Sequence, residues 1–458
     1  AFCFGGFFEG AAGFGTPVAV TGAVLIGLGF SPLAASGLAL IANTAPVAYG
    51  ALGTPVITLA KVTGLDEMML SSMIGRQLPF FSLLVPFWLI WAFAGRKGMM
   101  QIWPAILVAG GSFAIAQFLV SNYHGPMLVD VIASLVSMAS LIAFLKVWKP
   151  KTVWTSAKLI GHEEDGGEAH PLPTDIPQKA DKAAVRRAWM PWVILTVFVF
   201  VWGLPEFKKA VDTLPVVENS QPVLDAKGLP KRAGNTFFAP VFKFEDIHEK
   251  IEKVPPVVTK VKKEEAAYKL NWFTTTGTGI LLAALFAGLM MGYRPMQLVS
   301  QFGKTVWMVR YSLTTIVAML ALGYLTRFAG IDATLGLAFA FTGVFYPFFG
   351  TFLGWLGVAL TGSDTASNVL FGGLQRTTAE QLGISPILMA AANSSGGVMG
   401  KMIDAQSIVV ASTATHWYGH EGEILRYVFF HSIALCTLMG FFITAQAYLW
   451  PFTAMVLK

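Results

Sequence analysis

Long apolar runs alternate with short polar connections along most of the chain. A helix of about 20 apolar residues crosses the hydrocarbon core of a bilayer. Runs near this length cover residues 32–60, 77–95, 101–121, 126–145, 189–205, 271–292, 310–328, 333–349, 386–413 and 426–450. Because only helices and closed barrels satisfy their backbone in lipid, this pattern predicts an all-α integral membrane protein, a polytopic helical bundle.

Two further apolar stretches, residues 1–30 and 350–375, are rich in glycine and interrupted by polar side chains. Non-helical backbone within a bilayer is tolerated only where it is buried in protein or lines a polar cavity. We therefore expect broken helices or re-entrant hairpins here, as in secondary transporters, where such elements hold the substrate.

The two interrupted stretches also resemble each other. GFGTPVAV at 13–20 can be laid on GSDTASNV at 362–369, and each is followed by a G-x-S-P segment that begins at Gly29 or Gly383. An internal duplication explains the match, although small residues also recur by convergence in packed helices. If each interrupted run crosses the membrane once, the two repeats have inverted orientations.

Charged residues gather in two segments of an otherwise apolar chain. The mean hydropathy is +0.62 and 13% of residues are charged, against about one quarter in soluble domains. Residues 206–270 hold 22 of the 58 charged residues and residues 146–188 hold 14, so both are aqueous loops. The positive-inside rule places Arg96, Lys97 and the 146–188 loop in the cytoplasm. The connection 122–125 and a partly ordered insertion, 206–270, then lie outside.

This topology divides the chain into five parts. They are a first transmembrane repeat region (1–145), a cytoplasmic loop (146–188), a transmembrane helix (189–205), an external charged loop (206–270) and a second transmembrane repeat region (271–458).

Several functional classes lack their sequence signals. Only Cys3 and Cys436 occur, so no disulfide framework is indicated. His416 and His420 stand four apart beside Glu421, but in a glycine-containing loop, so no metal site is expected. No GxxxxGK[ST] motif supplies ATP binding, and no cofactor is expected. The net charge of +6 fits loops that face a membrane better than a nucleic-acid surface.

Asp364, in the segment LTGSDTASNVL, is the strongest candidate for chemistry. An ionisable side chain in a membrane helix costs about 2.5–3.5 kcal/mol on insertion scales, so it is retained mainly for function. Burial favours its protonated form, which suits a group that gains and loses a proton. Ser363 and Thr365 surround it with hydroxyl groups, and an exposed helix N-terminus there would favour an anion.

Other polar residues in apolar runs are weaker candidates. Asn393 and Ser394 precede a glycine pair, and Asn43 and Thr44 occupy the comparable segment of the first repeat. Such side chains also bond across helices in ordinary bundles. Lys401 and Asp404, three residues apart, are either proton-coupling groups or a structural ion pair; Glu9 is a further candidate proton relay.

The segments EGAAGFGTPVA, NTAPVAYGALG, GRQLPF, GWLGVALTGSDTASN and AANSSGGVMGKMIDAQSI, in this order, resemble the bacterial L-lactate permease family, which includes glycolate permeases. The resemblance covers essentially the whole chain and carries over Asp364 within TGSDT. It differs at Asp404 and Ala405, where the family reads Ser and Pro, so Asp404 is not carried over. Family members begin with additional transmembrane helices, so we expect this chain to lack part of the N-terminal scaffold.

The resemblance implies a multi-pass protein of the bacterial inner membrane that takes up L-lactate and related 2-hydroxymonocarboxylates, D-lactate and glycolate, with protons. The residues alone indicate a secondary transporter of a small anion. The expected substrate contacts are Thr16, Asn43, Thr44, Ser363, Thr365, Asn393 and Ser394, and the expected proton-coupling groups are Asp364, Glu9, Lys401 and Asp404. The alternatives are a sodium-coupled carboxylate transporter and a proton-relaying subunit of a membrane redox complex, which would need a continuous chain of ionisable residues.

Overall fold

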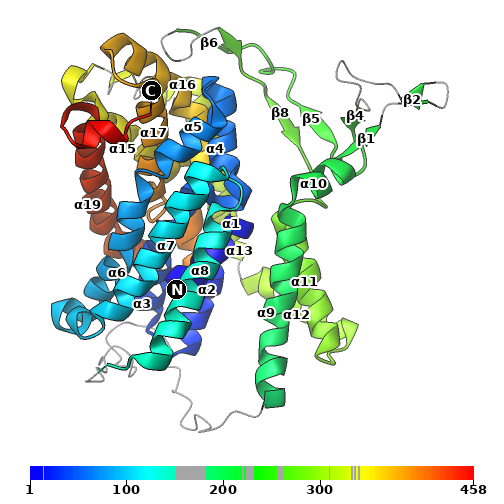
Figure 1. Cartoon of the computed structure of the whole chain (residues 1–458). Coiled ribbons are helices and arrows are strands. Elements are labelled where there is room, and N and C mark those ends of the chain that lie inside the picture. Colours follow the sequence, from blue (N-terminus) through cyan, green and yellow to red (C-terminus); the bar gives the residue numbers. More distant parts are fainter. Residues whose placement is uncertain are drawn as a thin grey trace. The chain divides into compact units, whose positions relative to one another are not determined.

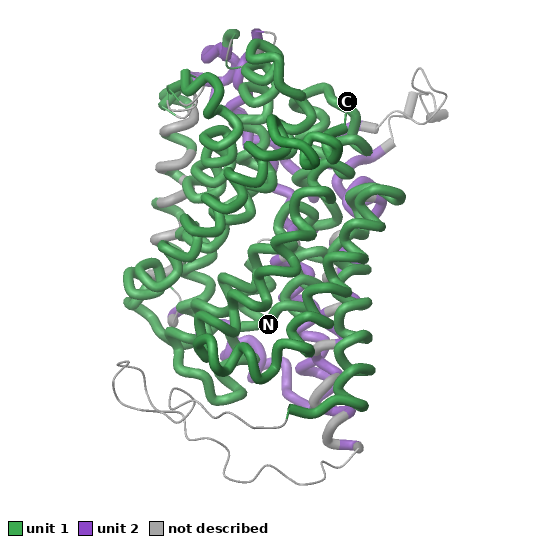
Figure 2. Tube along the Cα trace, turned by 60° about the vertical axis from the view of Figure 1, so that its left-hand side comes forward, with its two compact units in different colours: residues 1–175, 254–260, 309–458 green, residues 176–253, 261–308 purple. Residues whose placement is uncertain are grey.

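The protein folds into two compact units of helices (Figures 1 and 2). The computed structural model describes residues 1–13, 15–150, 182–215, 217–218, 221–222, 232–255, 257, 261–308, 310–331, 334, 337–338 and 341–457. Unit 1 comprises residues 1–175, 254–260 and 309–458, and unit 2 comprises residues 176–253 and 261–308. The division into repeat regions and loops given above remains a prediction.

Unit 1 contains most of the apolar helices. They are α1 (Phe2–Ala11), α2 (Thr16–Gly27), α3 (Pro32–Ala42), η1 (Val47–Tyr49), α4 (Gly50–Thr63), α5 (Glu67–Ile74), α6 (Leu78–Gln101), α7 (Trp103–Tyr123), α8 (Val129–Val147), α13 (Arg310–Ala329), η4 (Gly343–Phe345), α15 (Tyr346–Thr361), α16 (Asp364–Leu382), α17 (Pro386–Gly400), α18 (Ala405–Ala414), α19 (Glu421–Tyr448) and η5 (Phe452–Met455).

Unit 2 combines apolar helices with the charged insertion. Its helices are α9 (Lys182–Gly203), α10 (Pro205–Asp212), α11 (Thr276–Met290) and α12 (Pro295–Met308). The insertion forms antiparallel pairs of short strands, β1 (Thr213–Pro215) with β4 (Arg232–Gly234), β2 (Val217–Glu218) with β3 (Gln221–Pro222), β5 (Val241–Lys243) with β8 (Ala267–Lys269), and β6 (Glu252–Lys253) with β7 (Lys262–Lys263). These ladders are the one departure from the all-α prediction.

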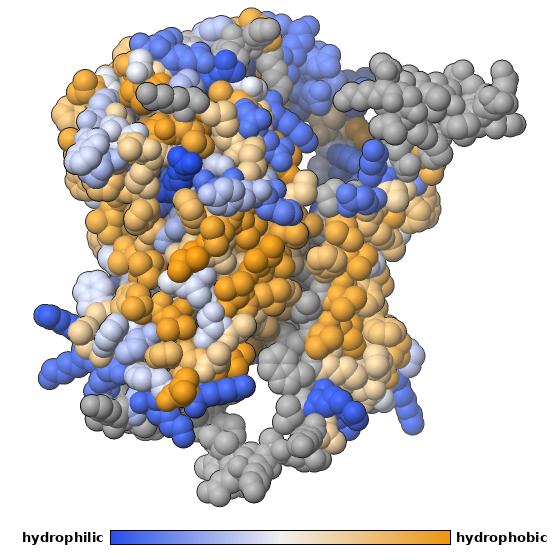
Figure 3. Space-filling model, viewed as in Figure 1, coloured by the Kyte–Doolittle hydropathy of each residue, from blue (hydrophilic) through white to orange (hydrophobic). Residues whose placement is uncertain are grey.

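Within the described residues, five helical segments are long and apolar enough to cross a membrane. They are Glu67–Gln101, Trp103–Tyr123, Val129–Val147, Gly343–Thr361 and Glu421–Tyr448. The pair Pro32–Ala42 and Val47–Thr63 would make a sixth span, bent by 63°. On the face shown in Figure 3, apolar residues cover the middle of unit 1 and hydrophilic residues gather at its ends. The prediction of a polytopic helical membrane protein is confirmed.

Four breaks between described helices of unit 1 interrupt apolar runs of the sequence. The predicted interruptions of 1–30 and 350–375 occur between α1 and α2 and between α15 and α16. Runs 32–60 and 386–413, which the apolar pattern presented as single crossings, are broken as well, between α3 and α4 and between α17 and α18. Hydrophobicity alone missed these two breaks because each holds only two strongly polar residues, Asn43 and Thr44 or Lys401 and Asp404, within a long apolar run.

The breaks repeat the same local geometry in the two halves of unit 1. Gly13 and Gly362, paired in the sequence match, both adopt left-handed backbone, with φ of 63° and 70°. Ser31 and Ser385 both cap a helix by accepting a hydrogen bond from the amide three residues on, and a proline follows each of them. This agreement supports the inferred duplication.

The two halves interlock through their broken elements. Helix α4 packs against α16, and in the corresponding manner α18 packs against α2. In Figure 1, α2 and α3 lie in the lower part of unit 1, whereas α16 and α17 lie in the upper part. The breaks of both halves therefore meet in the interior, with the hairpins directed to opposite ends, as the inverted orientation requires.

Glycines allow α15 and α17 to approach to backbone contact. A Cβ added at Gly354 would overlap the carbonyl oxygen of Asn393, and one added at Gly396 would overlap that of Thr351. In lipid, where apolar burial does not drive helix association, such close packing is a main source of stability.

We predict that Gly354→Ala lowers the stability of the purified protein by about 1–3 kcal/mol, the usual cost of overpacking a dense core. Thermal unfolding in detergent measures this. Gly27→Ala, at a helical glycine with no heavy atom within 4 Å of the added Cβ, is the control and leaves the melting temperature unchanged or higher. Equal melting temperatures for Gly354→Ala and the native protein would refute the close approach.

Labelling with a membrane-impermeant maleimide tests the orientation of unit 1. In a Cys3→Ser/Cys436→Ala background, we expect Tyr123→Cys, at a side chain that is 78% exposed, to react in intact cells. Lys97→Cys, near the C-terminal end of α6, should react only after permeabilisation, because basic connections remain in the cytoplasm. The reverse pattern would invert the topology.

Candidate substrate and proton site

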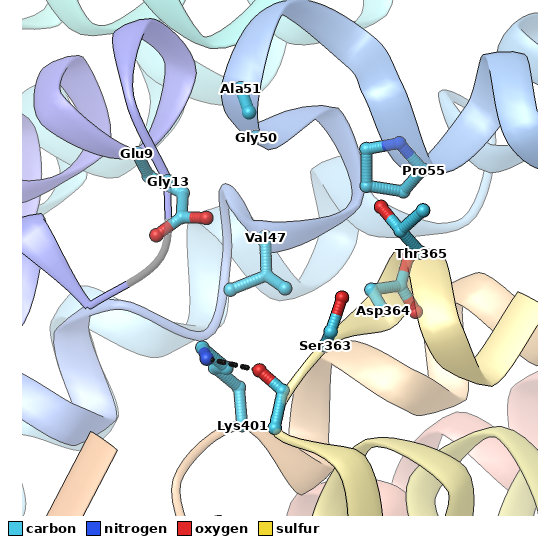
Figure 4. Close-up of a pocket in the computed structure, with 11 residues that line it drawn as sticks. Glu9, Gly13, Val47, Gly50, Ala51, Pro55, Ser363, Asp364, Thr365 and Lys401 are labelled. Atoms are coloured by element: carbon cyan, nitrogen blue, oxygen red, sulfur yellow. Dashed lines mark hydrogen bonds between the residues drawn. The ribbon is translucent and has the colours of Figure 1, made fainter. Parts of the chain in front are cut away.

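A small cavity lies where the broken helices of unit 1 meet (Figure 4). Its lining comes from the end of α1, from η1 and α4, from the break between α15 and α16, and from the end of α17. The lining residues are Glu9, Gly13, Val47, Gly50, Ala51, Pro55, Gly362, Ser363, Asp364, Thr365 and Lys401.

Asp364 reaches the cavity because α16 begins there. Ser363 caps the helix by accepting a hydrogen bond from the Ala366 amide at 3.3 Å, and Asp364 is the first helical residue, only 3% exposed. Its Oδ2 accepts hydrogen bonds from Ser394 and, at 3.4 Å, from Asn368. Its Oδ1 has no hydrogen-bond partner in the described part of the chain. The carboxyl group therefore has one anchored oxygen and one free oxygen.

A buried polar network fixes the anchored side of Asp364. Asn393 donates to Asn368 Oδ1 at 2.9 Å and accepts from Gln375 at 3.1 Å. Gln375 in turn accepts from the hydroxyl of Tyr346 at 2.8 Å. Asn393 and Ser394, predicted as substrate contacts, thus lie behind the cavity lining and hold Asp364 in place.

Lys401 connects two of the breaks. Its ammonium donates to the carbonyl of Gly362 at 2.6 Å and lies 3.2 Å from Asp404 Oδ2. Asp404 caps α18 by accepting from the Ser407 amide at 2.7 Å. Both charged side chains are buried. The predicted ion pair is therefore present, and it lies in the non-helical turn between α17 and α18, beside the left-handed residue that ends α15.

Glu9 faces the same cavity from α1. It is 4% exposed, and its Oε2 has no hydrogen-bond partner among the residues that the structure describes. Glycine at 13 and at 50 makes room for its carboxyl group, since a Cβ at Gly50 would overlap Oε1. The amide of Asn43, also buried, likewise has neither its nitrogen nor its oxygen paired within the described chain.

The predicted site residues thus fall into three groups. Asp364, Glu9, Lys401, Ser363 and Thr365 line the cavity, and Asn393, Ser394 and Asp404 support it from behind. Thr16, Asn43 and Thr44 are buried but are not among the lining residues, and the Thr44 hydroxyl donates to Ile41 O at 2.8 Å.

None of the residues expected in the site came from α4, which contributes one wall of the cavity. Ala51 and Leu52 adopt left-handed backbone, with φ of 46° and 57°, just before Gly53. Left-handed residues other than glycine cost about 1–2 kcal/mol each, and such strain gathers at functional sites. The close spacing of Gly50, Gly53 and Pro55 was the available signal.

The charges around the cavity are unbalanced when all groups are ionised. Glu9, Asp364 and Asp404 supply three negative charges against the single positive charge of Lys401. An anion entering this cluster would meet net repulsion, strong in a site of low effective dielectric constant. Protonation of a carboxyl group removes that repulsion.

The Lys401 and Asp404 pair yields a prediction on stability. Lys401→Gln strands the buried Asp404 carboxylate, and breaking a buried pair in this way costs about 3–5 kcal/mol. The double variant Lys401→Gln/Asp404→Asn should recover much of that loss, because asparagine still caps α18. Melting temperatures in detergent measure both. A double variant no more stable than Lys401→Gln would show that the charge pair is not responsible.

Comparison with known proteins agrees with this site. The family model described as L-lactate permease matches residues 1–450. The glycolate permease GlcA of Escherichia coli (strain K12) is 43% identical over 467 residues, which cover 100% of this chain and 78% of the relative. The L-lactate permease of the same strain is 42% identical over 457 residues, 98% of this chain and 77% of the relative.

The L-lactate permease of Bacillus subtilis (strain 168) is 42% identical over 440 residues, which cover 96% of this chain and 76% of the relative. No solved structure matches the fold. Sequence similarity along essentially the whole chain, together with the membrane-spanning helices, identifies a multi-pass protein of the bacterial inner membrane. The chain belongs to the L-lactate permease family.

Proposed function

We propose that this permease carries L-lactate and related 2-hydroxymonocarboxylates, D-lactate and glycolate, into the cell together with protons. The names of its relatives support a lactate or glycolate substrate. The observation that carries the proton coupling is the cavity itself, where the buried Asp364 lies among an excess of acidic groups. Its Oδ1, beside Gly397, has no hydrogen-bond partner in the described chain.

The substrate carboxylate would bind between Lys401 and the N-terminus of α16. The positive end of the helix dipole and an ammonium group both stabilise an anion. Ser363 and Thr365, at the same helix end, would bond the 2-hydroxyl group. Lys401 would then bind the substrate in place of some of its contacts with Gly362 and Asp404. Binding of substrate would in this way affect the two helix breaks that Lys401 connects.

Asp364 would take up the proton that accompanies the substrate. With Ser394 and Asn368 donating to Oδ2, the free Oδ1 is the position for the proton. The protonated acid no longer repels the bound anion, and the loaded site carries one charge fewer when it reorients across the bilayer, where moving a charge is costly. Release of substrate and proton on the cytoplasmic side would return the carrier to its starting state.

Uptake by proteoliposomes tests this role. We expect Asp364→Asn to reduce lactate uptake driven by an inward proton gradient by at least about tenfold, which corresponds to ~1.4 kcal/mol in the barrier. Exchange of labelled for unlabelled lactate at equal pH should persist, because asparagine resembles the protonated acid. The matched control is Asp66→Asn, which alters an exposed aspartate at the start of another helix, α5, and should behave as the native protein.

Gradient-driven uptake unaffected by Asp364→Asn would contradict the proposal. Faster uptake in sodium buffer than in choline buffer at the same pH would favour a sodium-coupled transporter, since carboxylate and carbonyl oxygens also bind hard cations.

A further inference from the structure

A further buried acid of unit 1, Asp130, packs against α1 near the cavity and has no part in the site described above. It occupies the first turn of α8 and is 1% exposed. Neither of its carboxyl oxygens has a hydrogen-bond partner within the described ranges. A carboxylate buried without a partner is strongly disfavoured unless it is protonated, so retaining one at this position calls for a function.

Glycines on α1 allow this helix to pack closely against Asp130 and the next turn of α8. A Cβ added at Gly10 would lie 2.8 Å from the Cβ of Asp130, and one added at Gly6 would lie 2.7 Å from Ser134 Oγ. Cys3, further along the same face, contacts the hydroxyl of Ser137 at 3.1 Å. Small residues on α1 therefore pack against a polar stripe on α8, formed by Asp130, Ser134 and Ser137.

Asp130 lies between the cavity and one end of unit 1. On the cavity side, Glu9 adjoins Gly10, the residue of α1 that packs against Asp130, and the two carboxyl groups are near enough to interact electrostatically. On the other side, α8 follows the connection 124–128, in which the side chains of His124 and Met127 are exposed. This connection lies at the end of unit 1 opposite Arg96 and Lys97. Because the positive-inside rule places those two residues in the cytoplasm, it assigns the connection 124–128 to the outside.

Within the described chain, two other titratable groups lie near enough to Asp130 to interact with it electrostatically. From η1 comes the hydroxyl of Tyr49, which donates to Ser71 O at 2.7 Å. Helix α1 brings Glu9, whereas His124, the C-cap residue of α7, is exposed in the connection before α8. Since the Tyr49 hydroxyl is engaged with the Ser71 carbonyl, Glu9 is the acid placed to exchange protons with Asp130.

We propose that Asp130 and Glu9 form a proton-entry path, in which Asp130 takes a proton from the side of the 124–128 connection and passes it through Glu9 towards Asp364. The proton leaves the carboxyl group of Asp130 as it adds to the carboxylate of Glu9, and a proton from the aqueous side restores Asp130. This inference rests on the proposed proton symport. It makes Asp130 a relay residue that does not touch the substrate.

Comparing net uptake with exchange separates a relay from a structural role. In proteoliposomes, Asp130→Asn should slow proton-gradient-driven lactate uptake by about tenfold or more, the scale expected when a positioned proton-transfer group is removed. Exchange of labelled for unlabelled lactate at equal pH, which needs no net proton entry, should stay within about twofold of the native rate. Ser134→Ala, one turn along the same stripe, is the control and should leave both rates unchanged.

Each result has a clear consequence. The relay would be overturned if Asp130→Asn took up lactate at the native net rate. It would also be overturned if a correctly folded Asp130→Asn lost both net uptake and exchange. If Asp130→Asn does not fold, Asp130→Ser removes the carboxyl group without adding volume and is judged by the same two rates. If uptake by the native protein did not depend on the proton gradient, the proposed symport itself would be refuted. Failure of the relay can therefore be distinguished from failure of the symport.

Discussion

Carboxyl groups buried inside an apolar helical bundle must be paired, hydrogen-bonded or protonated, and this constraint shapes the interior of unit 1. Each acid there meets it differently. Asp404 pairs with Lys401 and caps α18, Asp364 is hydrogen-bonded through one oxygen only, and Asp130 has no hydrogen-bond partner in the described chain. A paired acid such as Asp404 stabilises the structure, whereas acids with unpaired oxygens, such as Asp364 and Asp130, are suited to exchange protons.

The broken helices make this arrangement possible. Each break exposes polar backbone that would be unstable in lipid, so the breaks are gathered in the interior and satisfied by side chains such as Ser363 and Lys401. Because the two halves interlock through α4 with α16 and through α18 with α2, one cavity receives residues from both repeats. The same close packing links any movement of Lys401 to two breaks at once.

Much of this was predictable from the sequence. A long apolar run or a lone aspartate among small polar residues is a local signal, so the helical bundle, the breaks near residues 13 and 362 and the candidate Asp364 could all be recognised. The breaks after α3 and α17 were harder, because two polar residues within a long apolar run, such as Lys401 and Asp404, can also be a helical ion pair or a packing contact. The placement of Asn393 and Ser394 behind the cavity depends on tertiary contacts with α16, 18 to 30 residues away. The packing of α4, which carries Ala51, against α16 joins segments 313 residues apart. Spacing along one chain reveals neither kind of contact.

The central claim is that an anion enters this acidic cavity only together with a proton. Calorimetry of lactate binding to the purified protein, repeated at one pH in buffers of different ionisation enthalpy, counts the protons taken up on binding. The account predicts uptake of about one proton per lactate bound by the native protein, since one group must be neutralised, and none by Asp364→Asn. Binding heats that are independent of the buffer in the native protein would contradict it.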